Sequence, residues 1–334
     1  MFWYSKKRNK KYYYKHTAMS EDPDVEFMMG EEYDKHDWTA EPEGSWEDIL
    51  KNHAQKIRDT HGYLRLWYSG GSDSQTILNA FVKNGIHIDE IAMVRLSPTN
   101  NFNSPGMEEI NSVAIPQIRE IAKDIPNTKI KIYDVGYDQY ANWFKNHFDL
   151  NQTNVSNFRI FWSSNAHKLI PGINDHKNIG NLTGVEKPRL GSDEKGVHWY
   201  FVDESLANHI VSPDEEDHQV MFFMDPIVHA KQCYMVKNDN KFNGSTVDTP
   251  DYFLGVCRDK LFINFSHGKT IIGPNSSPKA LMDINDALAD PKSKHLVDEW
   301  RNGLFAHGVD LKHFNNNDVM LGLVGILSKK YYLA

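Results

Sequence analysis

A glycine turn between an apolar run and an amphipathic stretch constrains the fold of this chain more than any other feature. The run from Tyr63 to Tyr68 leads into Ser69-Gly70-Gly71-Ser72-Asp73-Ser74, and the stretch Gln75 to Asn84 follows directly. Adjacent glycines permit a tight turn and a close approach of the backbone to a ligand. The first amides of a helix have no partner within the helix, so they point at whatever lies in the turn. Strand, turn and helix together predict an anion site of the kind that binds phosphate.

The stretch after the turn has the residue spacing of a helix. The apolar residues that share one face are Ile77, Leu78, Phe81 and Val82. Gly85 then ends the pattern as a left-handed cap does. Upstream, Ser45 and Asp48 have the spacing of a capping box, which predicts the start of another helix.

Strand-like and helix-like segments alternate along the following residues. We expect strands at 63–68, 90–96, 129–135 and 178–183, and helical segments at 107–125, 138–148 and 157–169. Pro116 should kink or break the first of these helical segments, because proline lacks the amide hydrogen that a helix interior needs. Alternation of this kind implies a parallel sheet with right-handed crossovers and a ligand site at the carboxyl ends of the strands. The sequence therefore predicts an α/β fold with a doubly wound, mainly parallel, Rossmann-like sheet.

The chain of 334 residues divides into three predicted regions. They are an N-terminal extension at 1–44, a nucleotide-binding domain at 45–190 and an irregular α+β region at 191–334. In the last region we expect strands at 197–202, 220–224, 253–257 and 260–265, and helices at 279–289, 294–305 and 319–327.

The N-terminal extension is basic and aromatic in its first part and acidic in its second. Six basic residues lie between Lys6 and Lys15, around three consecutive tyrosines, and eight acidic residues lie between Glu21 and Asp37. Such an arm can contact nucleic acid through phosphate contacts and stacking. The alternative, which we favour, is a solvated arm whose two halves pair with each other or lie on the core.

Composition narrows the class of protein further. A net charge of −8 argues against a surface that coats nucleic acid, and no apolar run is long enough to cross a membrane. We therefore expect a cytoplasmic protein without a membrane partner, and a homodimer is compatible with the sequence. Only Cys233 and Cys257 are present, with neither a CxxC pair nor a zinc-ligand cluster around them. We interpret both as buried, unreactive thiols.

The hexapeptide Ser69 to Ser74 resembles the SGGxDS signature of the PP-loop, or N-type, ATP pyrophosphatases. This superfamily includes GMP synthetase, asparagine synthetase, tRNA-thiolating enzymes and the phosphoadenylylsulfate reductases. Walker-type GxxxxGK[ST] and dinucleotide-type GxGxxG motifs are absent from the sequence. The resemblance implies an adenine nucleotide alpha hydrolase-like fold that binds ATP and Mg²⁺. The residues implied to hold the phosphates are Ser69, Gly70, Gly71, Ser72, Asp73 and Ser74.

Asp73 is the unexpected residue of this loop, because a carboxylate repels a polyphosphate unless a cation lies between them. Mg²⁺ accepts one or two carboxylates together with phosphate oxygens, so Asp73 is a candidate metal ligand and catalytic residue. Capping of the following helix is an equally supported role.

A second candidate loop, Thr183-Gly184-Val185-Glu186-Lys187-Pro188-Arg189, follows the fourth predicted strand. It resembles the TGxR-type loop of the phosphoadenylylsulfate reductase branch, although Val185-Glu186 stands where that branch has its arginine. The resemblance implies that Gly184 contacts nucleotide and that Lys187 and Arg189 act on the polyphosphate. Solvated charges on a surface loop are the alternative.

Two weaker resemblances concern the base and the C-terminal region. In families with this fold the turn after the second strand holds the adenine or ribose, which implies contacts from Leu96 and Ser97. Asp225-Pro226, with His229, Lys231 and Gln232, is similar to a late motif of phage-encoded PP-loop proteins of unassigned role. A helix start with ordinary surface charges is the interpretation that we favour for this segment.

Together these features predict an enzyme that cleaves ATP between the α and β phosphates. It would adenylate a small-molecule or nucleotide acceptor, release pyrophosphate and then release AMP. One alternative is an enzyme that resembles phosphoadenylylsulfate reductases or sulfotransferases, which the absence of a C-terminal thiol disfavours. Another is a nucleotide-binding module without catalytic activity.

Overall fold

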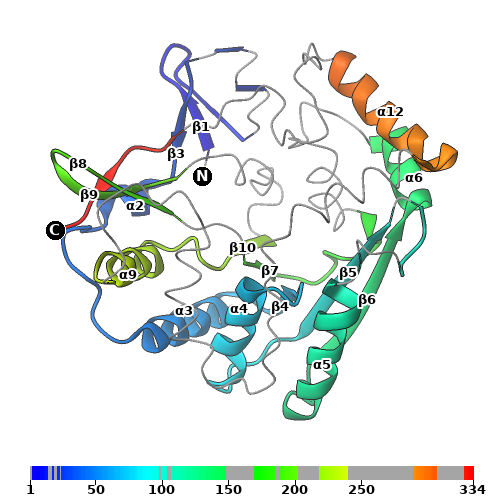
Figure 1. Cartoon of the computed structure of the whole chain (residues 1–334), viewed down its shortest axis with the longest axis horizontal. Coiled ribbons are helices and arrows are strands. Elements are labelled where there is room, and N and C mark those ends of the chain that lie inside the picture. The colour runs from blue at the N-terminus through cyan, green and yellow to red at the C-terminus, as the bar shows by residue number, and fades with distance from the viewer. Residues whose placement is uncertain are drawn as a thin grey trace.

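A computed structural model describes most of the chain, namely residues 2–13, 17–18, 21–22, 24–97, 99–103, 107, 109–147, 169–184, 188–201, 218–239, 289–306 and 327–334. A five-stranded sheet crosses its lower half, with every strand parallel to its neighbours, in the order β10-β7-β4-β5-β6 (Figure 1). The bounds are β4 Tyr63–Trp67, β5 Glu90–Ser97, β6 Lys129–Gly136, β7 Ile179–Thr183 and β10 Gln219–Met221. The expected α/β, Rossmann-like architecture with a mainly parallel sheet is confirmed.

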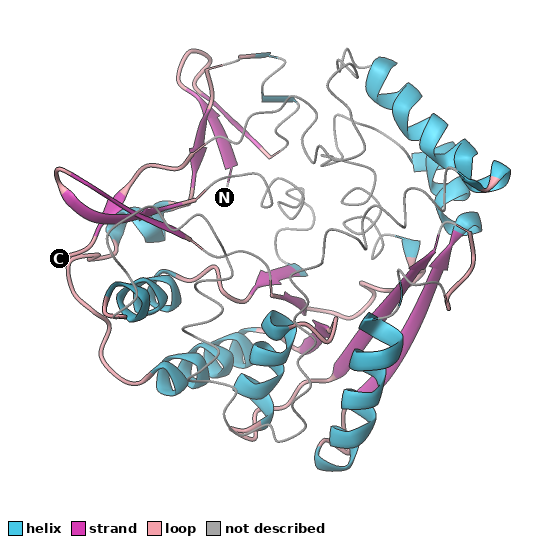
Figure 2. Cartoon of the chain, viewed as in Figure 1, coloured by secondary structure: helices cyan, strands magenta, loops and turns pink. Residues whose placement is uncertain are grey.

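Helices flank this sheet, and a further helix lies at the upper right of the view (Figure 2). The main helices are α3 Trp46–Thr60, α4 Ser72–Val82, α5 Ile115–Ile121, α6 Tyr137–His147, α9 Pro226–Lys237 and α12 Pro291–Ala306. Helix α3 begins at the predicted capping box, in which Ser45 and Asp48 each bond the other's backbone amide. Helix α4 ends as predicted, since Gly85 has φ 64° and the amide of Ile86 reaches back to the carbonyl of Phe81.

The helical segment continues through Pro116 without a break, but its hydrogen bonding changes there from π-helical to α-helical. A π-helical segment, η2 Ile110–Ala114, precedes α5, and a 3₁₀ turn, η3 Ala122–Asp124, ends it. Proline has no amide hydrogen, so it is tolerated where a new helical segment begins. Pro116 lies in the first turn of α5 and thereby marks the junction.

One hydrophobic core lies between the sheet and helices α3, α4 and α5. Leu64 and Leu66 of β4 and Ile91 and Met93 of β5 are almost fully buried in it. The opposite face of β4 carries Arg65, which is polar but equally buried. Its guanidinium pairs with Glu90 of β5 at 2.6 Å and also donates to the side chain of Asn181 on β7. Buried charges are stable only when paired in this way.

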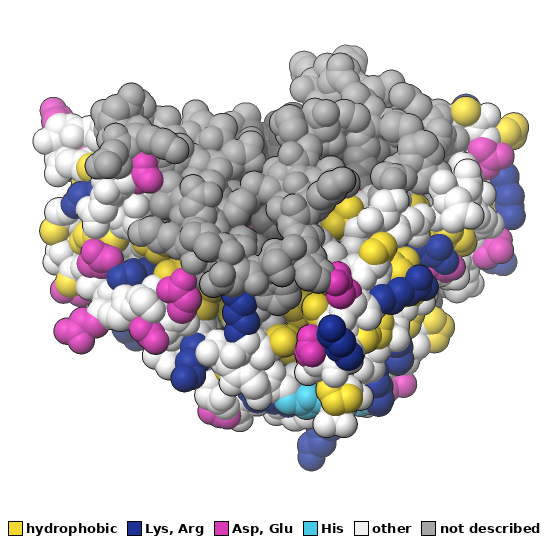
Figure 3. Space-filling view, turned by 60° about the horizontal axis from the view of Figure 1, so that its bottom comes forward, with side chains coloured by type: hydrophobic (Ala, Val, Ile, Leu, Met, Phe, Trp, Pro, Cys, Tyr) yellow, Lys and Arg dark blue, Asp and Glu magenta, His cyan; other side chains and the backbone are white. Residues whose placement is uncertain are grey.

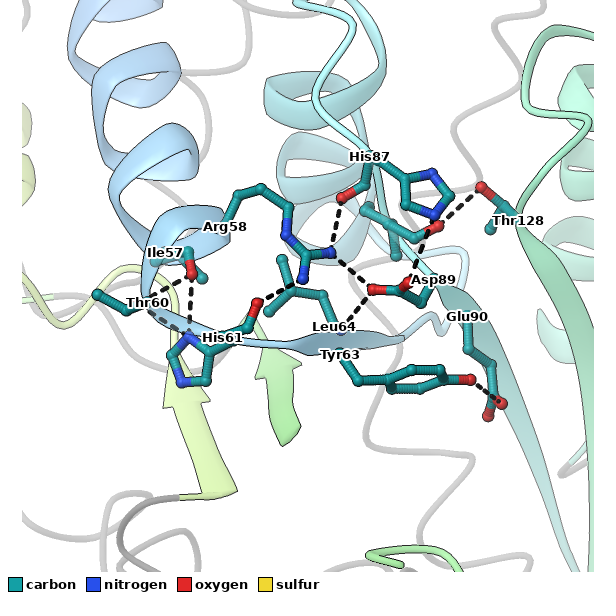
Figure 4. A network of polar contacts seen from close by, with 11 residues as sticks. Ile57, Arg58, Thr60, His61, Tyr63, Leu64, His87, Asp89, Glu90 and Thr128 are labelled. Carbon is teal, nitrogen blue, oxygen red and sulfur yellow. Dashed lines mark hydrogen bonds and ion pairs between the residues drawn. The ribbon is translucent and has the colours of Figure 1, made fainter. Parts of the chain in front are cut away.

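Polar contacts also fasten the amino ends of the strands to helix α3 (Figure 4). Arg58, near the end of α3, donates to Asp89 at 2.6 Å and to the carbonyls of His61 and His87. Asp89 accepts in addition from the amide of Leu64 at 2.8 Å. The start of β4 and the start of β5 are therefore held in register from the same helix.

A second core joins the first residues of the chain to segments near its end. It contains a sheet of β1 Phe2–Ser5, β2 Lys10–Tyr12 and β3 Glu26–Met28, and a sheet of β8 Arg189–Asp193, β9 Gly196–Tyr200 and β11 Tyr331–Tyr332. Trp3, Trp199 and Tyr331 are buried together in this cluster, with Tyr33 of α2 Glu31–Lys35. The N-terminal segment is thus folded into a core, and the expectation that it is a solvated arm is wrong.

The two halves of the N-terminal segment pair as expected. Lys6 bonds Glu26, and Arg8 and Lys10 both lie within ion-pair distance of Glu21. Across the face drawn in Figure 3, basic side chains are interspersed with acidic and apolar ones. The interpretation of nucleic-acid contact gains no support from this arrangement, because acidic residues oppose three of the cations.

Helix α9 connects the two cores. Val228 and Met235 belong to the first core, whereas Ala230, Cys233 and Tyr234 belong to the second. Strand β10, immediately before α9, is hydrogen bonded to β7 although it lies beyond residue 190. The boundaries at residues 44 and 190 stay predictions.

Several predicted segments lie outside the described residues. They are the strands at 253–257 and 260–265, the helix at 157–169 except its last residue, and the helices at 279–289 and 319–327 except residues 289 and 327. The remaining predicted strands and helices are present, with their bounds shifted by a few residues. In the described part of the chain, no helix combines the length and apolar character needed to cross a membrane.

Candidate functional site

The sheet has a topological switch point between β4 and β7. The chain passes from β4 to β5 and β6 on one side, and it later fills the other side with β7 and β10. Loops that leave neighbouring strands in opposite directions open a crevice at the carboxyl ends, which is where open α/β sheets bind ligands. The two loops predicted from the sequence, after Trp67 and after Thr183, flank this crevice.

Hydrogen bonds within the glycine turn fix its shape. The Ser74 hydroxyl accepts from the amide of Ser69 at 3.2 Å and donates to the carbonyl of Gly71 at 3.1 Å. The Ser69 hydroxyl accepts from the amide of Gly71 at 3.2 Å. Ser74 is nearly buried and braces the loop, and its hydroxyl oxygen also lies 3.3 Å from the hydroxyl oxygen of Ser69, within hydrogen-bond distance. The side chain of Ser72 lies outside the described part of the loop.

Gly70 cannot be substituted in this turn without strain. Its φ is +81°, in the left-handed region that residues with a Cβ rarely adopt. A methyl group added here would lie 3.0 Å from Cα, Cβ and N of Ala114 in η2. The loop therefore packs directly against the backbone of the helical segment that follows β5.

Helix α4 presents its amino end to the crevice. Gly71 is the N-cap, and no side chain of the described residues caps the helix. The first-turn amides carry a partial positive charge that favours an anion. Asp73 lies in the first turn, two residues after the N-cap, where a carboxylate complements the partial positive charge of the helix end. Both of its expected roles stay predictions.

Gly184, at the end of β7, lies against Asp73. A Cβ at Gly184 would be 2.8 Å from the Cβ of Asp73 and 3.1 Å from its carbonyl carbon. The second predicted loop thus begins in direct contact with the first. Residues 185–187, including Lys187, lie outside the described residues, and Arg189 is the first residue of β8, which pairs with β9 in a separate sheet.

The carboxyl end of β5 forms the third side of the crevice. Leu96 is half-buried there and Ser97 is buried, with its hydroxyl 3.2 Å from that of Thr99. The amide of Leu96 donates to the sulfur of Met107 at 3.1 Å. On the β6 side, Arg95 makes two contacts of 2.6 Å with Asp134.

Three residues at the carboxyl end of the sheet were not predicted from the sequence. The carboxylate of Glu109 would lie 3.5 Å from a Cβ at Gly71, so a second acidic group accompanies Asp73. Asn100, with φ 60°, accepts from the first amide of α6 at 2.8 Å. Met107 is the third. Glu109 follows Ser104-Pro105-Gly106, a turn before a helical run, and that position was the signal available in the sequence.

The segment around Asp225 is a helix start, as expected, but its charges are not ordinary surface charges. Asp225 caps α9 through the amides of Ile227 and Val228 and lies 3.5 Å from a ring nitrogen of His53. His229 is fully buried, and this burial lowers its pKa to about 3. The neutral ring contacts the Tyr33 hydroxyl at 3.0 Å, which ties α9 to the N-terminal segment.

Cys233 is fully buried on the same helix, as expected for an unreactive thiol, and Cys257 lies outside the described residues. At the opposite end of the sheet, a cavity of about 370 Å³ lies between the end of α4, the start of β5 and the start of β6. None of the predicted site residues lines it. The crevice is therefore the part of the structure that brings the predicted residues together.

No known protein family matches the sequence of this chain, and no curated protein matches it. The structure brings Ser69, Gly70, Gly71 and Asp73 together with Gly184 at one switch point. It does not bring Arg189 to them through any described contact. The function is consequently inferred from the geometry of the crevice and from the residues of the loop.

Proposed function

We propose that this protein binds MgATP at the switch point and cleaves it between the α and β phosphates, transferring AMP to an acceptor oxygen. The contact between Gly184 and Asp73 is the observation that carries this proposal. It makes one site of the two loops that resemble nucleotide-binding loops, at the position where open α/β sheets bind ligands.

The glycine turn suits a polyphosphate better than a single small anion. The amides of Ser69 and Gly71 are bonded within the turn, so the donors proposed for the phosphates are those at the amino end of α4, which have no partner within the helix. Charge that develops on departing pyrophosphate would be stabilised by donors that are already oriented, which is the arrangement that contributes most to such reactions. Lys187 and Arg189 are proposed to add positive charge from the second loop.

The carboxylates near the loop fit magnesium. Asp73 lies at the start of α4 and Glu109 lies near Gly71, so the donors present are the hard oxygens that this ion prefers. Bound there with phosphate oxygens, Mg²⁺ would neutralise part of the polyphosphate charge. Asp73 is the ligand that we propose.

The reaction itself requires no covalent enzyme intermediate. An acceptor oxygen attacks the α phosphorus, the bond from that phosphorus to the bridging oxygen breaks, and pyrophosphate leaves with the electron pair. The residues of the turn hold the leaving group, while Leu96 and Ser97 at the end of β5 are proposed to hold the base. The acceptor is a small molecule or a nucleotide that enters beside Gly184.

Replacement of Asp73 tests the metal and the nucleotide together. Asp73→Asn should weaken MgATP binding about tenfold to a hundredfold, the range for loss of a charged contact, while binding of ATP in EDTA is unchanged or stronger. Asp124→Asn, at an exposed acid on the other end of the sheet, is the matched control. Titration calorimetry with and without Mg²⁺ gives both values.

Product analysis tests the bond that is cleaved. Incubation with MgATP, pools of candidate acceptors, and ammonia or an amine as the nucleophile that displaces AMP from the adenylated acceptor should yield AMP and pyrophosphate in equal amounts. Formation of ADP alone, or ATP binding without any product across all pools, contradicts the proposed reaction. Equal MgATP affinity of the Asp73→Asn and Asp124→Asn variants contradicts the metal ligand.

A further inference from the structure

Strand β5 extends past β4 at the crevice and leaves one of its edges open. Pairing of the two strands ends at Trp67 and Ala92, and the amide of Tyr68 makes one more bond to the Ala92 carbonyl. Pairing with β6 continues without interruption to Ser97. Beyond Ala92, therefore, the side of β5 that faces β4 has no strand beside it in the described part of the sheet.

Leu96 presents its backbone groups on this open side. Alternate residues of a strand direct their N–H and C=O groups to the same neighbour. Ala92 faces β4, so Leu96, four residues later in an unbroken register, faces the crevice. A donor and an acceptor from one residue thus lie next to the glycine turn.

The donor of this pair is held by a weak acceptor. The Leu96 amide bonds the thioether of Met107 at 3.1 Å, and Met107 is only 5 % exposed. A thioether accepts hydrogen bonds poorly, and an unbranched methionine side chain changes rotamer at little cost. Met107 therefore fills the open edge of β5 with a group that is easily displaced.

We propose that Met107 occupies the position of the base when no nucleotide is bound, and that a ring nitrogen of the base replaces its sulfur as acceptor for Leu96. This inference rests on the proposed function, because it places the base at the end of β5. The adjacent Leu96 carbonyl then accepts from an exocyclic amino group. The N1 edge of adenine offers a ring acceptor beside an amino group, whereas the same edge of guanine offers a ring donor beside a carbonyl, so the pair discriminates adenine from guanine at this edge.

The need to displace Met107 lowers the apparent affinity for ATP, because only the fraction of molecules in which this side chain is withdrawn can bind the base. Met107→Leu keeps the side-chain volume and removes the acceptor. This variant should bind ATP about twofold to threefold more tightly, the lower end of the range for one net hydrogen bond, because a thioether accepts poorly. Its affinity for inorganic tripolyphosphate, which has no base, should be unchanged. Met235→Leu, on α9 in the first core, is the matched control and should leave both affinities unchanged.

Methionine methyl NMR follows the displacement in the unmutated chain, which contains 11 methionines. The Met107 methyl signal, assigned by its NOE to the Leu96 amide, should move on addition of AMP and stay in place with tripolyphosphate. This measurement tests the role of Met107 even if the Met107→Leu variant does not fold.

The outcomes separate this inference from the proposed function. Absence of ATP binding to the unmutated protein contradicts the proposed function and, with it, the role of Met107. If ATP binds and is cleaved, but Met107→Leu has equal or weaker affinity and the methyl signal ignores AMP, the role of Met107 is wrong while the proposed function stands. An equal affinity gain for ATP and tripolyphosphate also overturns it, because the effect would then lie at the phosphates.

Discussion

Replacement of Gly70 by alanine offers the most direct test of the loop geometry. The variant has two separate costs. Alanine at φ +81° is strained by about 1–2 kcal/mol. Its methyl group would also lie 3.0 Å from three atoms of Ala114, two of them backbone, so the neighbour cannot swing aside. Overpacking of this kind costs about 1–3 kcal/mol, which gives a total of about 2–5 kcal/mol.

Gly85 supplies a matched control for the strain alone. Its φ is +64° and no atom lies within 4 Å of the position of a Cβ. Gly85→Ala should therefore cost only about 1–2 kcal/mol. The difference between the two variants isolates the contact between the loop and η2, which should amount to about 1–3 kcal/mol.

Urea unfolding monitored by far-ultraviolet circular dichroism measures both costs, and calorimetric titration with MgATP measures the effect on the site. Gly70→Ala should lose at least about tenfold in affinity, since the loop must shift to relieve the contact, whereas Gly85→Ala should retain the affinity. Equal destabilisation of the two variants would refute the argument from Ala114. Unchanged MgATP binding to a destabilised Gly70→Ala variant would show that the loop shape does not determine binding.

Two further predictions concern the scaffold. Glu90→Gln leaves Arg65 buried without its charged partner and should lower the free energy of unfolding by about 3–5 kcal/mol. Burial raises the pKa of Glu90, but hydrogen bonds from Arg65 and Lys131 outweigh this effect and lower the pKa overall. In urea titrations, the difference in free energy of unfolding between the variant and the unmutated chain should therefore shrink as the pH falls below the ordinary glutamate pKa of about 4.3. Gly136→Ala would put a Cβ 2.0 Å from the side-chain oxygen of Asn100 and should speed amide hydrogen exchange at Tyr137. The double variant Asn100→Ala/Gly136→Ala should lose less free energy of unfolding than the two single variants together. Additive losses would contradict the contact.

Features that local sequence decides were predicted correctly. The capping box at Ser45 and the left-handed residue at Gly85 each depend on residues within a few positions of one another. The apolar run Ile91 to Val94 of β5 was recognisable as a strand because both faces of this strand are largely covered.

Contacts between distant segments were not predictable in the same way. Nothing near Gly70 in the sequence indicates that Ala114 will lie against it, and Gly184 gives no local sign of Asp73. The partnership of Arg65 and Glu90 depends on the register of two strands. The sheet of β1 to β3 was missed for another reason, since Asn9 closes its first turn at φ 50° without the glycine that usually signals a hairpin.

The surroundings of Asp225 show how burial can invert an interpretation. His229 and Gln232 are polar and read as surface residues in the sequence, yet both are buried because α9 lies between two cores. A helix that is covered all round carries no amphipathic pattern from which its buried face can be recognised. Only the tertiary structure reveals such a position.

The second core has a consequence for how the chain folds during synthesis. Tyr33 and Trp38 pack against Trp199 and Tyr331, so residues separated by almost the entire chain share one cluster. Translation proceeds at about 5–20 residues per second, and the N-terminal aromatic side chains must therefore wait many seconds for their partners. The crevice-forming sheet can assemble earlier, once β10 has emerged. A nascent chain halted before residue 331 should consequently expose these aromatic residues and recruit chaperones.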